Sequence, residues 1–359
     1  MGMLRRTLLM AGMVPVLEGK PFGRLTRTQL EGWMRLADVP AVSVVSVAGG
    51  KAAFLQGGAA TAETIFAAAS LSKQVTAYAV LALARAGRWD LDKPLGDYVA
   101  LEGSPEAGRV TARMALSHST GFPNWRFEAG AALAPDAVPG KTFRYSGEGY
   151  VYMQRVMEKI TGVPFGRHVR ETVFAPLGMG ASTFGWRTPA ERTAAGHDGQ
   201  GVRRNSEKDN AALDAFAAKA CEEWTCEDCA AFLRETKRRV LTTNYAINAA
   251  ASLKTSATDY ARFLVTAMGV AQFGEKQVSF SGGAGTALGW GLGWGVETFD
   301  GRTFWWQWGD NPGYKNIVFV EPGRRAAVAV FTNGDKGGAV YRRAVAAMHG
   351  VDHPAFVWL

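Results

Sequence analysis

The pattern of hydrophobic and polar positions predicts strands at the beginning of the chain, followed by helices. Residues 41–48 alternate apolar and small polar side chains, and residues 51–56 continue in the same way after Gly49-Gly50. Two alternating runs around a Gly-Gly pair predict a β-hairpin. Residues 26–36 and 71–86 have the spacing of helices, and the second is rich in Ala and Leu.

Helices continue through the middle of the chain, and strand-like runs return near its end. The predicted helices are 113–117, 150–161, 165–173 and 339–348, and the late strands are 291–298, 303–308, 316–320 and 326–332. Strands on both sides of a helical middle predict an α+β fold. We expect one antiparallel sheet built from both termini and flanked by helices, with a mostly helical domain inserted.

The predicted domain boundaries follow the same pattern. Residues 21–72 and 245–359 form the α/β domain with the sheet, and residues 73–244 form the helical domain. Within the latter, residues 192–239 carry mixed charge and are predicted to be a loop or helical insertion.

Composition and charge narrow the classes of protein. The 359 residues are 47% hydrophobic and 20% charged, as in globular proteins. The net charge of +8 is spread along the chain, without a basic stripe interleaved with aromatic residues. We therefore expect no nucleic-acid partner. After the N-terminus, no apolar stretch is long enough to cross a bilayer, so no transmembrane span is expected.

The first twenty residues allow two interpretations. Arg5-Arg6 precedes a short apolar run, which resembles an export signal and favours a periplasmic or secreted protein. Glu18 and Lys20 follow that run closely, and no A-x-A cleavage site is present. The alternative is a flexible or loosely docked terminus on a cytoplasmic protein.

Three cysteines lie close together at Cys221, Cys226 and Cys229. A structural zinc site requires four ligands, and no nearby histidine supplies the fourth. The odd number argues against a disulfide framework, although one local bridge stays open. We predict no metal site.

Candidate chemistry begins at Ser70 and Lys73. Ser70 is the only serine with a lysine three positions later, and it opens the helix predicted over 71–86. The positive end of the helix dipole stabilises negative charge that develops at Ser70. The spacing puts Lys73 on the same face one turn deeper, where burial would lower its pKa and let it accept the serine proton. The alternative is a helix N-cap and a solvated lysine.

Two further groups have the residue types that such a nucleophile needs. Residues 144–150 contain Tyr145, and a tyrosine near lysine cations can ionise below its ordinary pKa and act as a base. Residues 307–314 follow a predicted strand and include Gly309, which would let a substrate approach the strand edge. Either group could also be an ordinary turn.

In this order, the three groups resemble the serine β-lactamase and penicillin-binding protein superfamily, whose motifs include S-x-x-K and K-T-G. The similarity is greatest to class C β-lactamases and to the related carboxylesterases and D-amino-acid peptidases. Further matching stretches are residues 66–73, 89–99, 110–121, 174–179, 289–294 and 331–334. Together they cover most of residues 41–334, with 192–239 uncertain.

The resemblance implies a role for each matching residue. Ser70 becomes the nucleophile, Lys73 its proton partner and Tyr145 the general base. The backbone N–H groups of Ser70 and Asp310 form the oxyanion hole. His118 belongs to a structural turn of the family pattern, although its residue type would also suit a catalytic triad. The implied partner is a small acyl substrate that forms an acyl-enzyme, and no cofactor is needed. The oligomeric state stays open.

Two departures from the family pattern bear on the substrate. Gly147 stands where β-lactamases carry an asparagine, and the contact is lost unless Glu148 or another group replaces it. Gln307 stands where relatives carry lysine or histidine, so the attraction for a substrate carboxylate is missing unless Lys315 supplies it.

We expect Gly147, Gln307, Trp308 and Gly309 to line the substrate site. Trp308, with Trp305 and Trp306, forms either an aromatic cleft wall or ordinary core. The departures predict an esterase acting on small neutral esters, with weak or no β-lactam hydrolysis. The alternatives are a β-lactamase or a D-amino-acid peptidase or amidase, and a non-catalytic binding or sensor protein.

Overall fold

Gly49 and Gly50 form the turn of the predicted hairpin in the computed structural model. The structure describes residues 22–101, 104–126, 131–185, 188–204, 221–235, 247–280 and 287–359. The two glycines have φ values of 56° and 79°, which a two-residue turn between twisted strands requires. They connect β1 (Ala41–Ala48) and β2 (Lys51–Gly58), which pair from Ala41↔Gly58 to Ala48↔Lys51.

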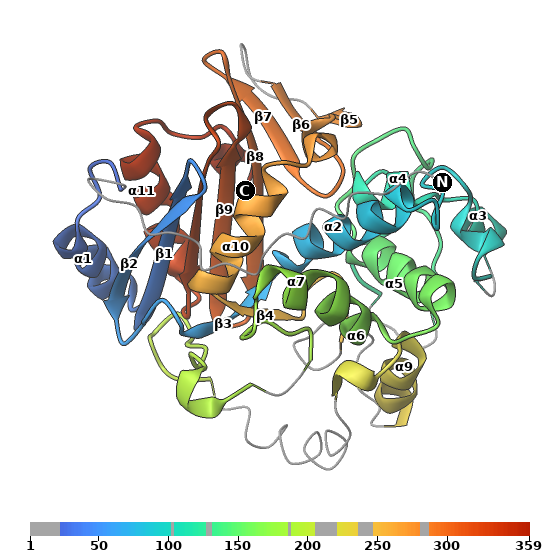
Figure 1. The fold of residues 1–359 in the computed structure, drawn as a ribbon, viewed down its shortest axis with the longest axis horizontal. Coiled ribbons are helices and arrows are strands. Elements are labelled where there is room, and N and C mark those ends of the chain that lie inside the picture. The colour runs from blue at the N-terminus through green and yellow to red at the C-terminus, as the bar shows by residue number, and fades with distance from the viewer. Residues whose placement is uncertain are drawn as a thin grey trace, which may run out of the picture.

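Within the described residues, eight strands form one antiparallel sheet in the order β2-β1-β10-β9-β8-β7-β6-β5. The later strands are β5 (Val278–Phe280), β6 (Ala287–Trp290), β7 (Gly295–Phe299), β8 (Arg302–Asn311), β9 (Tyr314–Glu321) and β10 (Ala326–Thr332). Because β1 pairs with β10, blue and red strands lie side by side in Figure 1. The predicted α+β fold, with a sheet from both parts of the chain, is confirmed.

Helices lie on both sides of the sheet (Figure 1). They are α1 (Arg27–Ala37), α2 (Ser72–Arg85), α3 (Pro105–Gly108), α4 (Ala112–Leu116), α5 (Gly147–Thr161), α6 (Phe165–Val169), α7 (Ala175–Leu177), α9 (Cys226–Glu235), α10 (Ala257–Ala267), α11 (Gly337–His349) and α12 (Ala355–Trp358). A π-helical turn (Arg170–Phe174) joins α6 to α7. The predicted helices are found, with ends shifted by a few residues.

The sheet separates two hydrophobic cores. On one face, α1 and α11 pack on apolar side chains of β1, β8, β9 and β10. On the other face, α2, α5 and α10 contribute to a larger core with the alternate positions of the same strands. The predicted candidate residues of α2 belong to this second side.

Part of the predicted strand over 291–298 is a turn. Residues 291–294 connect β6 to β7, and the strand begins at Gly295. Gly293 has a φ of 93°, and a Cβ there would lie 2.3 Å from Cβ of Ala77 in α2. The turn therefore depends on glycine for both its conformation and its close approach to α2.

Two short strands, β3 (Ile65–Ala69) and β4 (Leu253–Ser256), form a separate ribbon that the pattern did not predict. All five β3 residues are buried, so no alternation of polar side chains marks the strand. This ribbon leads directly into α2 on one strand and into α10 on the other.

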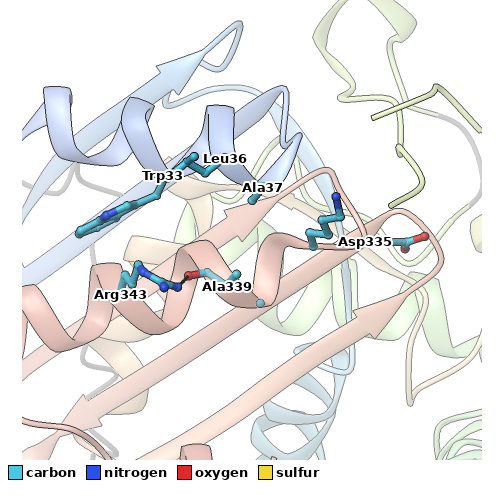
Figure 2. A pocket seen from close by; sticks show the side chains of 8 residues that line it. Trp33, Leu36, Ala37, Asp335, Ala339 and Arg343 are labelled. Carbon is cyan, nitrogen blue, oxygen red and sulfur yellow. Dashed lines mark hydrogen bonds between the residues drawn. The ribbon is translucent and has the colours of Figure 1, made fainter. Parts of the chain in front are cut away.

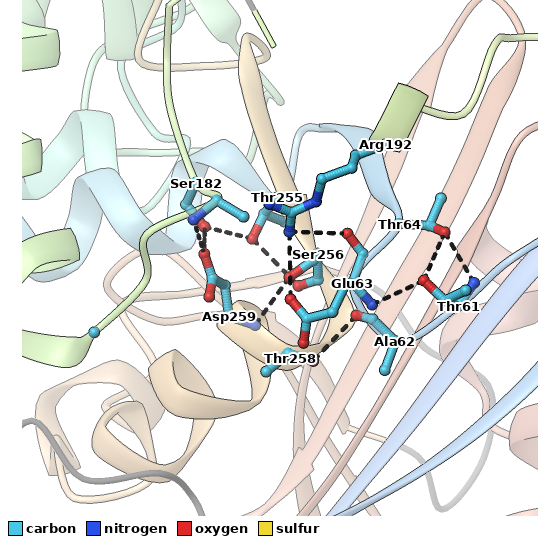
Figure 3. A network of polar contacts seen from close by, with 12 residues as sticks. Thr61, Ala62, Glu63, Thr64, Ser182, Arg192, Thr255, Ser256, Thr258 and Asp259 are labelled. Carbon is cyan, nitrogen blue, oxygen red and sulfur yellow. Dashed lines mark hydrogen bonds and ion pairs between the residues drawn. The ribbon is translucent and has the colours of Figure 1, made fainter. Parts of the chain in front are cut away.

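A buried carboxylate joins α10 to the chain after α7. Asp259 accepts hydrogen bonds from the backbone N–H of Ala181 (2.8 Å), the hydroxyl of Ser182 (2.9 Å) and the guanidinium of Arg262 (2.8 Å). Figure 3 shows this network continuing to Thr255 of β4. These hydrogen bonds satisfy the oxygens of the buried Asp259 carboxylate. The network therefore holds the chain after α7 against α10 and the β3–β4 ribbon.

The N-terminus and parts of the 192–239 segment lie outside the described residues. The export-signal residues lie in 1–21, outside the described residues. Residues 205–220 and 236–246 also lie outside, and α9 between them is helical. In the part of the chain that the structure describes, no helix has the length and apolarity to cross a membrane.

Candidate active site

Ser70 stands between β3 and α2, and the residue before it has an unusual backbone conformation. Ala69 has a φ of 53°, in the left-handed region that costs a non-glycine residue roughly 1–2 kcal/mol. The Ser72 hydroxyl donates to the Ala69 carbonyl (2.6 Å) and accepts from the Leu253 N–H (2.9 Å). Such a conformation persists where surrounding contacts enforce it, so Ser70 is held in one position at the start of α2.

Lys73 lies one helical turn beyond Ser70, as the spacing predicted. Its Nζ is 3.0 Å from the Ser70 Oγ and donates to the Ala250 carbonyl at 2.9 Å. The side chain is fully buried, and burial lowers the pKa of Lys73 to about 7. A large fraction of this amine is therefore neutral near pH 7 and has a lone pair available for the serine proton.

The carbonyl of Ala250 is a site group that the sequence did not reveal. The Asn248 Oδ1 accepts from the N–H groups of Ala250 (3.1 Å) and Ala251 (2.7 Å) and so shapes this turn. Asparagine favours such side-chain-to-backbone turns, and that is the one local signal for the segment. A backbone acceptor carries no side-chain signature, so its role depends on the fold.

Tyr145 is held against the site by His118. The His118 carbonyl accepts from the Arg144 N–H (2.6 Å), and its Nδ1 accepts from the Ser146 N–H (3.1 Å). The rings of His118 and Trp308 lie 4.2 and 4.6 Å from the Tyr145 ring, centroid to centroid. Burial, and then the Lys73 amine, lower the pKa of His118 well below its ordinary value, so the imidazole is neutral. These contacts match the structural role predicted for His118.

The pKa of Tyr145 shifts in the direction opposite to our expectation. Burial raises it well above its ordinary value, although hydrogen bonds with Ser70 and Gln307 act the other way. The Lys73 Nζ lies over the Tyr145 ring, 4.8 Å from its centroid. Desolvation therefore outweighs these hydrogen bonds, and Tyr145 keeps its proton at neutral pH.

The side chain of Gln307 is hydrogen-bonded to Tyr145. Its buried amide nitrogen donates to the Tyr145 hydroxyl at 2.9 Å and to the Trp308 carbonyl at 2.8 Å. Because the Trp308 carbonyl oxygen can only accept a hydrogen bond, the Gln307 atom beside it is the amide nitrogen and not the amide oxygen. The position where relatives carry a cation therefore supplies an uncharged donor to the tyrosine.

Gly309 lets β8 approach the backbone that carries Ser70. A Cβ at this position would lie 2.3 Å from the Ala68 carbonyl oxygen of β3. The pairing of β7 with β8 ends at Gly295↔Trp306, so β7 does not cover this part of β8. The strand edge next to Ser70 is thus built from residues 307–311.

Lys315 is already engaged and does not take the place of the missing cation. It faces Asp310 across the β8–β9 pair, and its Nζ forms an ion pair with that carboxylate. The same Nζ is 3.9 Å from the carboxylate of Asp335. The hypothesis that Lys315 supplies the attraction for a substrate carboxylate is therefore wrong for this arrangement.

An aromatic ring occupies the space where a side chain at Gly147 would lie. A Cβ there would be 2.5 Å from the ring of Trp125. Glu148 is fully buried and accepts from the backbone N–H of Arg126 (2.9 Å) and from its guanidinium (2.9 Å). Glu148 therefore anchors the 124–126 segment and does not replace the missing asparagine.

The neighbouring tryptophans belong mainly to the core. Trp305 and Trp306 are 4% and 0% exposed, on opposite faces of β8. Trp308 is partly exposed and packs on Tyr145. The interpretation of Trp305 and Trp306 as a cleft wall is wrong, and the core alternative holds for both.

Other candidate features lie away from Ser70. Cys226 and Cys229 are buried thiols, and the described residues contain no His, Cys, Asp and Glu cluster arranged to hold a metal. A cavity of about 360 Å³ lies between α1 and α11. Trp33, Leu36 and Arg343 are among the residues that line it (Figure 2). These helices cover the face of the sheet opposite α2.

The fold agrees with comparisons with known proteins. The Beta-lactamase family model matches residues 30–351, so the chain belongs to this family. Penicillin-binding protein 4 of Amycolatopsis lactamdurans is 24% identical over 322 residues, covering 77% of this chain and 74% of that protein.

Two solved structures illustrate the range of similar folds. A class C β-lactamase from Rhodobacter sphaeroides aligns with a TM-score of 0.67 at 18% identity, over 90% of this chain and 97% of that one. The D-amino acid amidase from Ochrobactrum anthropi SV3 aligns with a TM-score of 0.65 at 20% identity, over 90% and 98%. The chain therefore has the fold of the family's serine hydrolases.

Proposed function

We propose that this protein is a serine hydrolase that forms an acyl-enzyme on Ser70, with neutral small esters as its substrates. The observation that carries the proposal is the contact between the Ser70 hydroxyl and the buried Lys73 amine, whose pKa is about 7. A serine is a weak nucleophile until a base takes its proton, and a neutral amine at hydrogen-bond distance is such a base.

Acylation begins when the Lys73 Nζ accepts the Ser70 proton as Oγ attacks the substrate carbonyl. One amine hydrogen is held by the Ala250 carbonyl, which helps to turn the nitrogen lone pair toward Ser70. The C–O double bond opens to an oxyanion, which the N–H groups of Ser70 and Asp310 stabilise in this proposal. Such donors are worth about 2.7–4 kcal/mol each when aimed at the developing charge.

Tyr145 passes the proton on to the leaving alcohol. Its hydroxyl is protonated at neutral pH and hydrogen-bonds with Ser70, so it donates to the leaving oxygen and is reprotonated from the Lys73 ammonium. The ester C–O bond breaks and the acyl-enzyme remains. Water then attacks the acyl carbonyl while Lys73 takes its proton. The bond from the acyl carbon to the Ser70 Oγ breaks, Oγ recovers the proton from Lys73, and the acid is released. The proposal gives the role of base to Lys73, where the family resemblance alone gave it to Tyr145.

Three features support neutral substrates over β-lactams and peptide carboxylates. Gln307 places an uncharged amide at the position of the family's cation, and the Lys315 ammonium is paired with Asp310. Trp125 covers Gly147, where β-lactamases carry the asparagine that holds the acylamino side chain. A carboxylate that enters this site meets an uncharged amide in place of a cation, so its desolvation is less well offset.

A D-amino-acid amide is the second candidate substrate. The similarity to a D-amino acid amidase structure favours it. An α-amino amide also lacks the carboxylate that this site does not accommodate. Amide bonds need stronger protonation of the leaving nitrogen than esters, so activity toward amides depends more heavily on Tyr145.

Paired kinetics test the proposal. p-Nitrophenyl acetate, p-nitrophenyl butyrate, D-phenylalanine amide and nitrocefin are compared with wild type and Ser70→Ala. The proposal expects ester turnover that Ser70→Ala removes, with little nitrocefin cleavage. Amide turnover above ester turnover would favour the amidase, and fast nitrocefin cleavage the β-lactamase. Absence of any turnover and of acylation would favour the non-catalytic alternative.

A further inference from the structure

Four aromatic side chains near Tyr145 leave apolar surface exposed. Phe143, Phe280 and Trp308 are partly exposed, and Trp358 of α12 is 37% exposed. Trp358 contacts the others with ring centroids 5.6 Å from Phe143, 5.0 Å from Phe280 and 5.5 Å from Trp308. Exposed aromatic clusters on a soluble protein often mark a binding surface. We call these four residues the aromatic cluster.

The aromatic cluster is continuous with the proposed proton donor. Trp308 packs on the Tyr145 ring with centroids 4.6 Å apart, and Trp358 meets the Trp308 ring edge-on. The residue before Trp308 donates to the Tyr145 hydroxyl. A group that receives its proton from Tyr145 would then lie near Trp308, with Trp358 as the next ring outward.

The segment that presents Trp358 is firmly anchored. Buried Glu297 of β7 accepts from the Ala355 N–H (3.0 Å) and binds the buried His353 ring through its other oxygen. The second ring nitrogen of His353 lies 2.8 Å from the Nδ1 of His349. These contacts fix both ends of the turn between α11 and α12, so Trp358 is held in place before a substrate arrives.

From this placement we infer that Trp308 and Trp358 bind the alcohol part of the ester, and that Trp358 determines specificity for aromatic or bulky apolar alcohols. The inference rests on the proposed function, because the leaving alcohol is the group that Tyr145 protonates. Offset and edge-to-face contacts with a second ring would hold an aromatic alcohol on this surface. On this inference, the acyl part lies on the other side of the scissile bond, so its size should not affect the contact with Trp358.

The test compares Trp358→Ala with wild type on esters that differ in one part. 2-Phenylethyl acetate and ethyl acetate share the acyl group, whereas p-nitrophenyl acetate and butyrate share the alcohol. We expect kcat/KM for 2-phenylethyl acetate to fall about tenfold, mainly through KM, and that for ethyl acetate to stay within about twofold. The butyrate-to-acetate ratio should not change.

Two further variants separate this role from a structural one. Val357→Ala changes a neighbour in α12 that is 92% exposed, and all four rates should stay at wild-type values. Trp358→Phe should recover most of the lost rate on 2-phenylethyl acetate. If Trp358→Ala does not fold, Trp358→Leu still covers Trp306 and should show the same selective fall.

Three results would overturn the inference while leaving the proposed function intact: equal loss on 2-phenylethyl and ethyl acetate, a changed butyrate-to-acetate ratio, or no change at all. If wild type hydrolyses no ester, or if Ser70→Ala hydrolyses it equally well, the proposed function itself fails.

Discussion

The Nζ of the fully buried Lys73 lies 3.0 Å from the Oγ of Ser70, which is itself partly exposed. Burial is the cause of the lowered pKa of Lys73. A lysine in this state serves as a base near neutral pH, and after accepting a proton it becomes a buried cation beside the Tyr145 ring. The fold thus buries Lys73 beside Ser70, and this burial gives the lysine the pKa that the proposed chemistry needs.

The rate should depend on the ionisation of Lys73. The active form is the neutral amine, so kcat/KM for p-nitrophenyl acetate should rise with pH and level off above a midpoint at about 7. Lys73→Arg should lose about 100- to 10,000-fold at every pH, because arginine does not deprotonate. A wild-type profile that is flat between pH 5 and 9, after correction for spontaneous hydrolysis, would rule out Lys73 as the base.

Gly309→Ala should disrupt the approach of β8 to β3. The added methyl would meet the Ala68 carbonyl at 2.3 Å, and backbone cannot move aside as a side chain can. We expect at least about a hundredfold loss of ester turnover, because a shift of about 1 Å in the site is costly. Gly323→Ala is the control, since nothing lies within 4 Å of a Cβ there. Equal activity of the two variants would show that the strand edge tolerates displacement.

Gln307→Lys should move the substrate preference toward anions. The added ammonium would offer a carboxylate the attraction that Lys315 does not supply, because Lys315 is paired with Asp310. We expect the ratio of nitrocefin to p-nitrophenyl acetate turnover to rise about tenfold or more, within the range for a charged hydrogen bond. Gln307→Met, similar in length and uncharged, should not raise it. If the ratio does not change in Gln307→Lys, the missing charge at position 307 is not the reason for the preference for neutral substrates.

Acid should destabilise the fold through His349. Burial, followed by the neighbouring His353 and then Arg302 and Arg324, lowers the pKa of His349 to about 3. The unfolded chain, with the ordinary pKa of about 6.5, then binds the proton first, so stability is lost as pH falls from about 6.5 toward 3.

One such group contributes at most about 1.4 kcal/mol per pH unit within that window. Urea unfolding of wild type and His349→Gln at pH 7, 6 and 5 measures the difference. The free energy of unfolding should fall less steeply with acid in the variant. Parallel curves would mean that His349 titrates normally in the folded protein.

The parts of the fold that depend on local sequence could be predicted. Gly49-Gly50 between alternating runs fixes a hairpin, and the three-residue spacing puts Lys73 beside Ser70 whatever else surrounds them. The prediction of a strand over 291–294 was wrong. The turn at Gly293 depends on its contact with α2, and the local sequence pattern does not encode that contact.

The site details that depend on distant contacts could not be predicted. Burial sets the direction of the Tyr145 pKa, and burial results from the packing of the whole fold. Trp125 over Gly147, the Ala250 carbonyl and Trp358 come from separate parts of the chain, and no spacing rule joins them. Each departs from the family pattern or lies outside it, so the motifs gave no indication of their places.

Mass spectrometry of the acylated protein tests the central claim most directly. Wild type is mixed with p-nitrophenyl butyrate, quenched in acid during turnover, digested and analysed beside Ser70→Ala. We predict one butyryl group on the peptide that contains Ser70, and neither adduct nor turnover in the variant. A butyryl group on another residue, or full turnover by Ser70→Ala, would contradict the assignment of Ser70 as the nucleophile.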